Sequence, residues 1–207
     1  MTGVQARAAL GDVSRETLER LEEYAALLTS WNARINLVSK PTIADLWTRH
    51  ILDSAQLFDL APGTARTWAD LGSGGGFPGL VIAILAAERR PDLRVTLVES
   101  DRRKAVFLRT VAQKTGVDAT VVTERIEALP PLGADVLSAR ALASLPDLLA
   151  YAARHLAPDG TALFPKGAGY RNEVKDALEH WRFRCEYIPS KTSPDATILR
   201  LGEIAGV

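Results

Sequence analysis

The chain has 207 residues, enough for one or two domains, and its 47% hydrophobic content excludes a wholly disordered protein. Its 25 Lys and Arg residues balance 25 Asp and Glu residues, so the sequence does not indicate a protein that coats polyanions through bulk positive charge. The single cysteine, Cys185, excludes both an intrachain disulfide framework and a cysteine-rich zinc site.

The first half of the chain has no pattern that indicates a membrane or secretory segment. No basic stretch is followed by an apolar one near the start, and the longest apolar run, residues 80–87, is far shorter than the roughly 20 residues of a membrane span. We therefore expect a soluble cytoplasmic protein with no membrane partner. No feature requires a second copy, so a monomer is expected.

The first 62 residues are predicted to be helical. Residues 14–31 carry apolar side chains at helical spacing, with Ser14 as the N-cap. Thr42 followed by Asp45 resembles the start of a capping box, so a second helix is expected from there to about residue 58. Pro62 and Gly63 would end this N-terminal extension.

From Thr67 onward, short apolar strands alternate with helices. Strands are expected at 67–71, 94–99, 119–123, 135–139 and 161–166, helices at 80–87, 101–116, 145–156 and 174–181, and a closing antiparallel pair at 182–188 and 196–201. This alternation predicts an α/β fold with a Rossmann-like, doubly wound and mostly parallel sheet. We expect one domain over residues 1–207, with the extension at 1–62 and the α/β core at 63–207.

The most distinctive motif is a loop, residues 70–79, with five glycines. A glycine-rich turn from a strand into a helix lets backbone N–H groups approach a ligand closely. The loop follows the first expected strand, and open α/β sheets bind ligands at the carboxyl ends of their strands. The loop therefore predicts a nucleotide-like cofactor.

The spacing of this loop favours S-adenosylmethionine over a dinucleotide. Gly72 and Gly74 match the G-x-G-x-x-G/A pattern of dinucleotide sites, but Phe77 stands at the third position. Glu99 closes the next strand, where its carboxylate can accept both ribose hydroxyls of an adenosine. Asp70, at the end of the first strand, suits a ligand with an amino group and a sulfonium rather than a pyrophosphate.

Further distinctive segments stand in order along the chain, at residues 31–37, 50 with 53–54, 71–79, 99–100, 104 with 107–109, 125–127, 140–145 and 166–167. Together they resemble the class I S-adenosylmethionine-dependent methyltransferases. More specifically, they resemble the glucose-inhibited division protein B family of 16S ribosomal RNA guanine-N7 methyltransferases. The resemblance covers residues from about 24 to 200, nearly the whole chain.

This resemblance implies S-adenosylmethionine as the cofactor and 16S rRNA or the small ribosomal subunit as the partner. It implies that Gly72 and Phe77 line the methionine and adenosine side, that Glu99 holds the ribose, and that Ile126 and Glu127 border the adenine. The full set of predicted cofactor-binding residues is Asp70, Gly72, Gly74, Gly76, Phe77, Glu99, Ile126, Glu127 and Arg140. No metal is expected.

Guanine N7 carries a lone pair and no proton, so methylation there needs no general base and can depend on positioning and electrostatics. We predict Arg140, at the end of the fourth strand, and Lys166, at the end of the fifth, as the catalytic residues. His50 and Asp53 share a helix face, and two interpretations stay open: contact with the active site or RNA, or a hydrogen bond between packed helices.

Two other functions remain as alternatives. One is a class I methyltransferase that acts on a small molecule or a protein, and the other is an NAD-binding oxidoreductase or a non-catalytic nucleotide-binding module. Phe77 and the lack of an evident proton-relay pair count against the oxidoreductase. The neutral net charge excludes only binding by indiscriminate phosphate attraction, so we expect a modest basic rim around the cofactor cavity.

Overall fold

The computed structural model describes residues 3–207, and it begins with two helices, α1 (Gly3–Ala8) and α2 (Arg15–Asn32). The predicted N-cap of α2 is confirmed, because the Oγ atom of Ser14 accepts a hydrogen bond from the backbone N–H of Thr17 at 3.1 Å. Glu88 holds this start of the helix against the core, since its carboxylate accepts hydrogen bonds from the Ser14 N–H and hydroxyl.

The helix predicted from Thr42 to about residue 58 is confirmed over its middle, but it begins later, ends earlier and is irregular. The segment is divided into a 3-10 turn, η1 (Lys40–Thr42), a π-helical stretch, η2 (Trp47–Leu52), a short helix, α3 (Asp53–Ala55), and a second 3-10 turn, η3 (Phe58–Leu60). Thr42 lies inside the first turn, where its hydroxyl donates to the Ser39 carbonyl at 2.7 Å instead of capping a helix.

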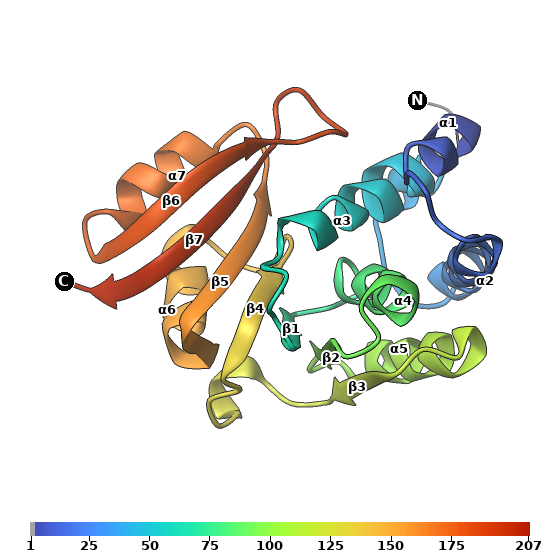
Figure 1. Ribbon diagram of the computed structural model, residues 1–207, viewed down its shortest axis with the longest axis horizontal. Coiled ribbons are helices and arrows are strands. Elements are labelled where there is room, and N and C mark those ends of the chain that lie inside the picture. Colours follow the sequence, from blue (N-terminus) through green and yellow to red (C-terminus); the bar gives the residue numbers. More distant parts are fainter. Residues whose placement is uncertain (1–2) are drawn as a thin grey trace.

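Seven strands form one twisted sheet in the order β3-β2-β1-β4-β5-β7-β6 (Figure 1). They are β1 (Thr67–Leu71), β2 (Arg94–Val98), β3 (Ala119–Val122), β4 (Ala134–Ala139), β5 (Leu156–Lys166), β6 (Trp181–Pro189) and β7 (Thr197–Gly206). Strands β1 to β5 pair in parallel, whereas β7 pairs antiparallel with both β5 and β6. The predicted fold class and the antiparallel closing pair are therefore confirmed.

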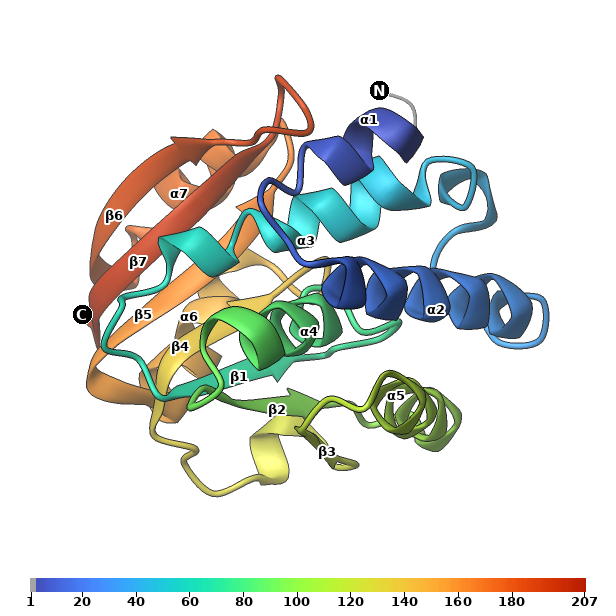
Figure 2. The same cartoon turned by 45° about the vertical axis from the view of Figure 1, so that its right-hand side comes forward.

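Helices cover both faces of this sheet. Those that follow the strands are α4 (Gly79–Arg89), α5 (Arg102–Thr115), the 3-10 turn η4 (Ile126–Ala128), α6 (Leu145–His155) and α7 (Tyr170–Ala177). The hydrophobic core on one face contains α4 and α5 together with the N-terminal segment, and the core on the other face contains α6 and α7. Helix α2 lies beside α4 and α5 (Figure 2), so the N-terminal segment shares its core with the sheet.

Strands β5 and β7 and helix α7 differ most from their predicted bounds, and β7 continues five residues beyond its predicted end, to Gly206. β5 begins at Leu156 rather than residue 161, because the stretch before Gly160 continues the strand through an irregular register with β4 instead of forming a turn. Helix α7 begins at Tyr170 and ends at Ala177, where the chain turns into β6 four residues later.

Candidate active site

A cavity of about 1410 Å³ lies at the carboxyl ends of the parallel strands. Its wall includes eight of the residues predicted from the sequence: Gly72, Gly74, Phe77, Glu99, Ile126, Glu127, Arg140 and Lys166. The ends of strands β1 to β5 and the loops that follow them supply these residues, which are spread over almost a hundred positions of the chain. The topology of a parallel sheet brings them together, because its strands all end at one edge.

Two predicted residues, Asp70 and Gly76, lie outside this wall. Asp70 is fully buried; its Oδ1 accepts a hydrogen bond from the Ser138 hydroxyl at 2.7 Å and its Oδ2 accepts one from the Gly79 N–H at 3.2 Å. Burial raises the pKa of Asp70 to about 6. Gly76 faces the core, where an added Cβ would lie 2.4 Å from a Leu80 methyl carbon. Both residues therefore stabilise the glycine loop on the side that faces the core.

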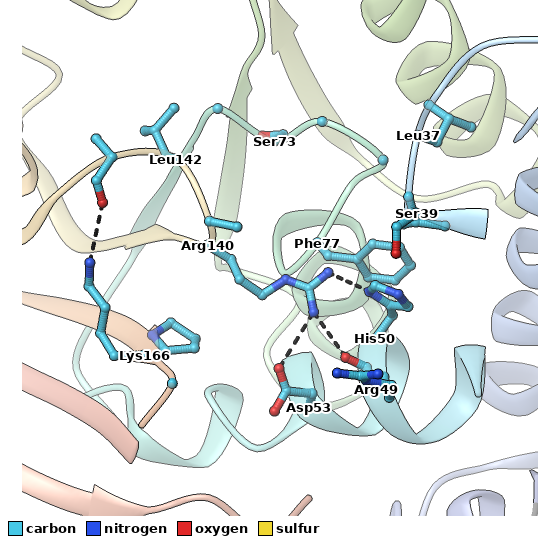
Figure 3. Close-up of a pocket in the computed structure, with 18 of the residues that line it drawn as sticks. Leu37, Ser39, Arg49, His50, Asp53, Ser73, Phe77, Arg140, Leu142 and Lys166 are labelled. Carbon is cyan, nitrogen blue, oxygen red and sulfur yellow. Dashed lines mark hydrogen bonds and ion pairs between the residues drawn. The ribbon is translucent and has the colours of Figure 1, made fainter. Parts of the chain in front are cut away.

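The glycine loop needs glycine for its backbone shape at two of the positions that line the cavity. Gly72 and Gly74 have φ angles of +63° and +55°, in the left-handed region that side-chain-bearing residues rarely adopt. A Cβ on Gly72 would also lie 2.5 Å from Leu142, which projects over the loop from the turn after β4 (Figure 3). The loop thus presents backbone to the cavity.

Glu99, directly after β2, is only 7% exposed. Its Oε2 atom accepts a hydrogen bond from the Gly74 N–H and its Oε1 atom accepts one from the Asp101 N–H, both at 2.8 Å. No cation forms an ion pair with Glu99 in the part of the chain that the structure describes. Since a carboxylate offers about four lone pairs, this group keeps acceptor capacity toward the cavity.

Ile126 and Glu127 form the η4 side of the wall. Ile126 is buried and supplies an apolar surface. The Glu127 carboxylate accepts a hydrogen bond from the Tyr151 hydroxyl at 2.7 Å. A hydrogen bond from its own backbone N–H, followed by this bond from Tyr151, lowers the pKa of Glu127. The cavity therefore has one apolar and one acidic group at this end.

Arg140 is the centre of a group of acceptors contributed by η2 and α3 (Figure 3). Its NH1 atom donates to the Arg49 carbonyl at 3.0 Å and lies 3.5 Å from the Asp53 carboxylate. Its NH2 atom lies 2.6 Å from Nδ1 of His50. Burial lowers the pKa of Arg140, and Asp53 opposes this change.

These contacts define the proton on His50. A guanidinium has only donors, so Nδ1 of His50 must accept, and the ring proton is on Nε2, 2.9 Å from the Thr42 hydroxyl. Burial, followed by the charges of Arg140 and Arg49, lowers the pKa of His50 to about 3. The open question about His50 is therefore answered for this structure: a neutral imidazole holds Arg140.

Phe77 links the glycine loop to the N-terminal helices. Its ring stacks on Tyr24 at 5.2 Å between centroids, lies 5.0 Å from the His50 ring, and carries the Arg140 guanidinium carbon 5.1 Å from its centre. The Tyr24 hydroxyl donates to the Gly75 carbonyl at 2.5 Å. Helix α2 thereby fixes both the loop and the aromatic face under Arg140.

Lys166 lies on the cavity wall at the end of β5, with its side chain directed toward the turn after β4 (Figure 3). Its Nζ atom donates to the Ala143 carbonyl at 3.2 Å and forms an ion pair of 2.7 Å with Glu173. The same Glu173 oxygen accepts a hydrogen bond from the Leu145 N–H, at the start of α6. Lys166 therefore ties the turn that follows Arg140 to α7.

The loop between β6 and β7 reaches the site through Asp53. The Thr192 hydroxyl donates to Asp53 Oδ1 at 2.7 Å, and Gln56 donates to the same oxygen at 2.9 Å. Gln56 in turn accepts a hydrogen bond from the Lys191 N–H.

Three residues of the site, Thr42, Arg49 and Thr192, were not predicted from the sequence, because isolated polar residues in loops and turns carry no spacing signal.

The charges of the cavity wall are mixed. Five Lys and Arg residues and six Asp and Glu residues line it, so the expected basic rim is not a property of this wall.

Among residues 3–207, no helix combines the length and apolar character needed to cross a bilayer.

Solved structures share this architecture. One is the ribosomal protein L11 methylase from Lactobacillus delbrueckii subsp. bulgaricus, with a TM-score of 0.59, 18% identity, and coverage of 74% of this chain and 78% of that one. Another is a TehB-like SAM-dependent methyltransferase from Corynebacterium glutamicum, with a TM-score of 0.57, 16% identity, and coverage of 86% and 98%. The fold is that of the class I S-adenosylmethionine-dependent methyltransferases.

Sequence similarity narrows this class to one family. Residues 17–194 match the model of the GidB family, rRNA small subunit methyltransferase G. A curated relative named ribosomal RNA small subunit methyltransferase G, from Ruegeria sp. strain TM1040, is 58% identical over 190 residues, which cover 92% of each chain. The chain belongs to the GidB family of methyltransferases.

Proposed function

We propose that the protein transfers the methyl group of S-adenosylmethionine to N7 of a guanine in 16S rRNA of the small ribosomal subunit. The observation that carries this proposal is the family match over residues 17–194, which includes every strand that contributes to the cavity wall except β7. The relatives' shared name supports an rRNA substrate. The choice of N7 is supported by the chemistry of the wall, as follows.

The residues of the wall fit the cofactor. Glu99 has spare acceptor capacity and no cationic partner among residues 3–207, as expected of a carboxylate that accepts two ribose hydroxyls. Ile126 offers an apolar surface for the adenine, and Gly72 and Gly74 offer backbone where side chains would intrude. The cavity of about 1410 Å³ exceeds the roughly 300–1,000 Å³ usual for one small ligand, which supports room for a target base as well.

The cofactor, when bound, supplies an electrophilic methyl group on a sulfonium. Attack by the in-plane lone pair of guanine N7 forms an N–C bond as the S–C bond breaks, and the positive charge passes to the purine. No proton is moved, so the site needs alignment rather than a base. In agreement, burial and the two nearby arginines keep the imidazole of His50 neutral, and its one lone pair on Nδ1 is engaged by Arg140.

Arg140 would position the guanine by donating to its O6 atom, which lies beside N7 on the same edge of the base. Arg49, His50 and Asp53 hold the guanidinium, and Phe77 supports its face. A fixed cation costs no reorganisation when the substrate binds. Lys166 would act by holding the turn after Arg140 through the Ala143 carbonyl.

The test uses small ribosomal subunits purified from a strain that lacks the gene. The purified protein and S-adenosylmethionine are added, the rRNA is digested, and the nucleosides are analysed by mass spectrometry. We expect one new N7-methylguanosine, in the decoding-region loop. Methylation at another guanine atom, or of a protein or small molecule instead of rRNA, would overturn the proposal.

The cofactor is tested separately by calorimetry with S-adenosylhomocysteine. We expect one site per chain, and binding of NAD with no binding of S-adenosylhomocysteine would refute the assignment. We propose further that the enzyme acts in the cytoplasm, which fits an rRNA substrate, and that it acts as a monomer. Light scattering during gel filtration tests the oligomeric state.

A further inference from the structure

A second hollow, of about 350 Å³, lies next to the main cavity. Residues 32–36 at the end of α2, Lys40 of η1, and residues 101, 103 and 104 at the start of α5 form its wall. Nothing in the chemistry derived above uses it. Lys104 lines both this hollow and the main cavity, so the two are neighbours.

The hollow has the cationic excess that the main cavity lacks. Arg34, Lys40, Arg103 and Lys104 stand against one carboxylate, that of Asp101. Asp101 is engaged as the N-cap of α5, where it accepts hydrogen bonds from two backbone N–H groups, and it also lies 3.5 Å from Arg103. Within residues 3–207, the other three cations form no ion pair with a carboxylate.

Asn32 adds a buried donor that lacks an acceptor. It is 3% exposed, and its Oδ1 atom accepts hydrogen bonds from the N–H groups of Leu37 and Val38, at 2.9 and 3.0 Å. These bonds fix the orientation of the amide, so Nδ2 is the group without a partner in the described chain. A buried donor of this kind costs free energy unless it finds an acceptor. Asn32 is one of the residues that line the hollow, so this unpaired donor lies in its wall, beneath the cations.

The connection between α2 and η1 separates the two hollows. On one side it touches the glycine loop, since a Cβ on Gly75 would lie 3.1 Å from the Leu37 carbonyl oxygen. Leu37, Val38 and Ser39 line the main cavity, while the residues just before them line the second hollow. An anion in the second hollow would therefore lie one short segment of chain away from a base in the main cavity.

We infer that the second hollow binds a phosphodiester of the substrate RNA next to the target nucleotide, through Arg34, Lys40 and Lys104. This inference rests on the proposed function and adds where the RNA backbone is held. It explains how a chain with no net charge binds RNA: a few unpaired cations are gathered beside the entrance instead of spread over the surface.

The experiment compares the double variant Arg34→Gln/Lys40→Gln with the control Arg94→Gln/Lys114→Gln. Both variants lose two exposed positive charges. Arg94 begins β2 and Lys114 is near the end of α5, so the control pair lies near the amino ends of the strands, away from the cavity. Binding to unmethylated small subunits is measured over a series of salt concentrations. Melting curves and S-adenosylhomocysteine binding establish that each variant is folded.

We expect the first variant to bind more weakly, with a slope of log K against log salt that is shallower by about 0.7–0.9, because one phosphate contact contributes that much. The control should match the wild type, and both variants should keep their affinity for S-adenosylhomocysteine. Equal salt slopes for the two double variants would overturn the inference while leaving the proposed function intact. Failure of the wild type to methylate the subunit would refute the proposed function instead.

A further arm uses inorganic phosphate alone. If millimolar phosphate raised the Tm of the wild type but not of Arg34→Gln/Lys40→Gln, and RNA binding of the variant were normal, the hollow would be a site for a free anion. That result would overturn the assignment to RNA.

Discussion

Removal of the Arg140 side chain is the most direct test of the site geometry. Arg140→Ala leaves the Arg49 carbonyl and Nδ1 of His50 without their donor, and it leaves Asp53 with Thr192 and Gln56 but no cation. Each unsatisfied acceptor costs about 1–3 kcal/mol, partly offset because a desolvated cation is also removed. We expect a net loss of about 1–3 kcal/mol, or a fall in Tm of about 2–12 °C for a chain of this size.

Methyl transfer should fall much further, by about 10²–10³-fold, as when one preorganised electrostatic donor is removed from an active site. The rate is measured with radiolabelled S-adenosylmethionine and saturating small subunits, and calorimetry with S-adenosylhomocysteine checks the cofactor site. Arg140→Lys keeps the charge but loses the planar guanidinium that reaches both the Arg49 carbonyl and His50. Its rate of methyl transfer should therefore lie between those of the wild type and Arg140→Ala. Full activity of Arg140→Ala with an unchanged melting curve would refute the assigned role.

Three further predictions concern residues around Arg140 and the loop. The pKa of His50 is about 3 in the folded chain and near 6.5 in the unfolded chain, so the unfolded chain binds more protons between these pH values. The free energy of unfolding should therefore fall by up to about 1.4 kcal/mol for each pH unit below pH 6.5. Urea unfolding measures this fall, which should be less steep in His50→Asn. Gly72→Ala should lower the Tm and weaken S-adenosylhomocysteine binding, since a left-handed residue with a Cβ costs about 1–2 kcal/mol and would displace Leu142; a wild-type affinity would contradict this. Glu99→Gln turns an N–H toward a backbone donor, so calorimetry should find at least a roughly tenfold weaker cofactor affinity, or about 1.4 kcal/mol.

The sequence was most informative where local chemistry and tertiary structure agree. Strand β1 has its predicted bounds, Thr67–Leu71. Its buried and mostly apolar residues are followed directly by glycines in the left-handed conformation, which cannot continue a strand. Glu99 and Asp70 show the limit of such reasoning. Both are carboxylates at the ends of neighbouring strands, and only the structure separates the one that lines the cavity from the one that is buried behind the loop.

The partners of Arg140 could not be predicted from the sequence for a different reason. Residues 42–58 have a helical pattern, but the pattern does not predict the π-helical stretch, which carries Arg49 and His50. Arg140 is 90 positions from His50, and hydrogen bonds over such separations depend on topology, not on spacing along the chain. The interpretation of His50 therefore stayed open until η2 and the end of β4 were placed.

The hydrogen bond between Thr192 and Asp53 joins residues 139 positions apart. Every predicted cofactor-binding residue precedes it in the chain, so a protein shortened before β6 would retain all of them and still lose the support of Asp53. Closing so long a loop is entropically more costly than closing a short one. During synthesis, β6 and the loop that follows it must therefore leave the ribosome before Asp53 has all of its hydrogen-bond partners.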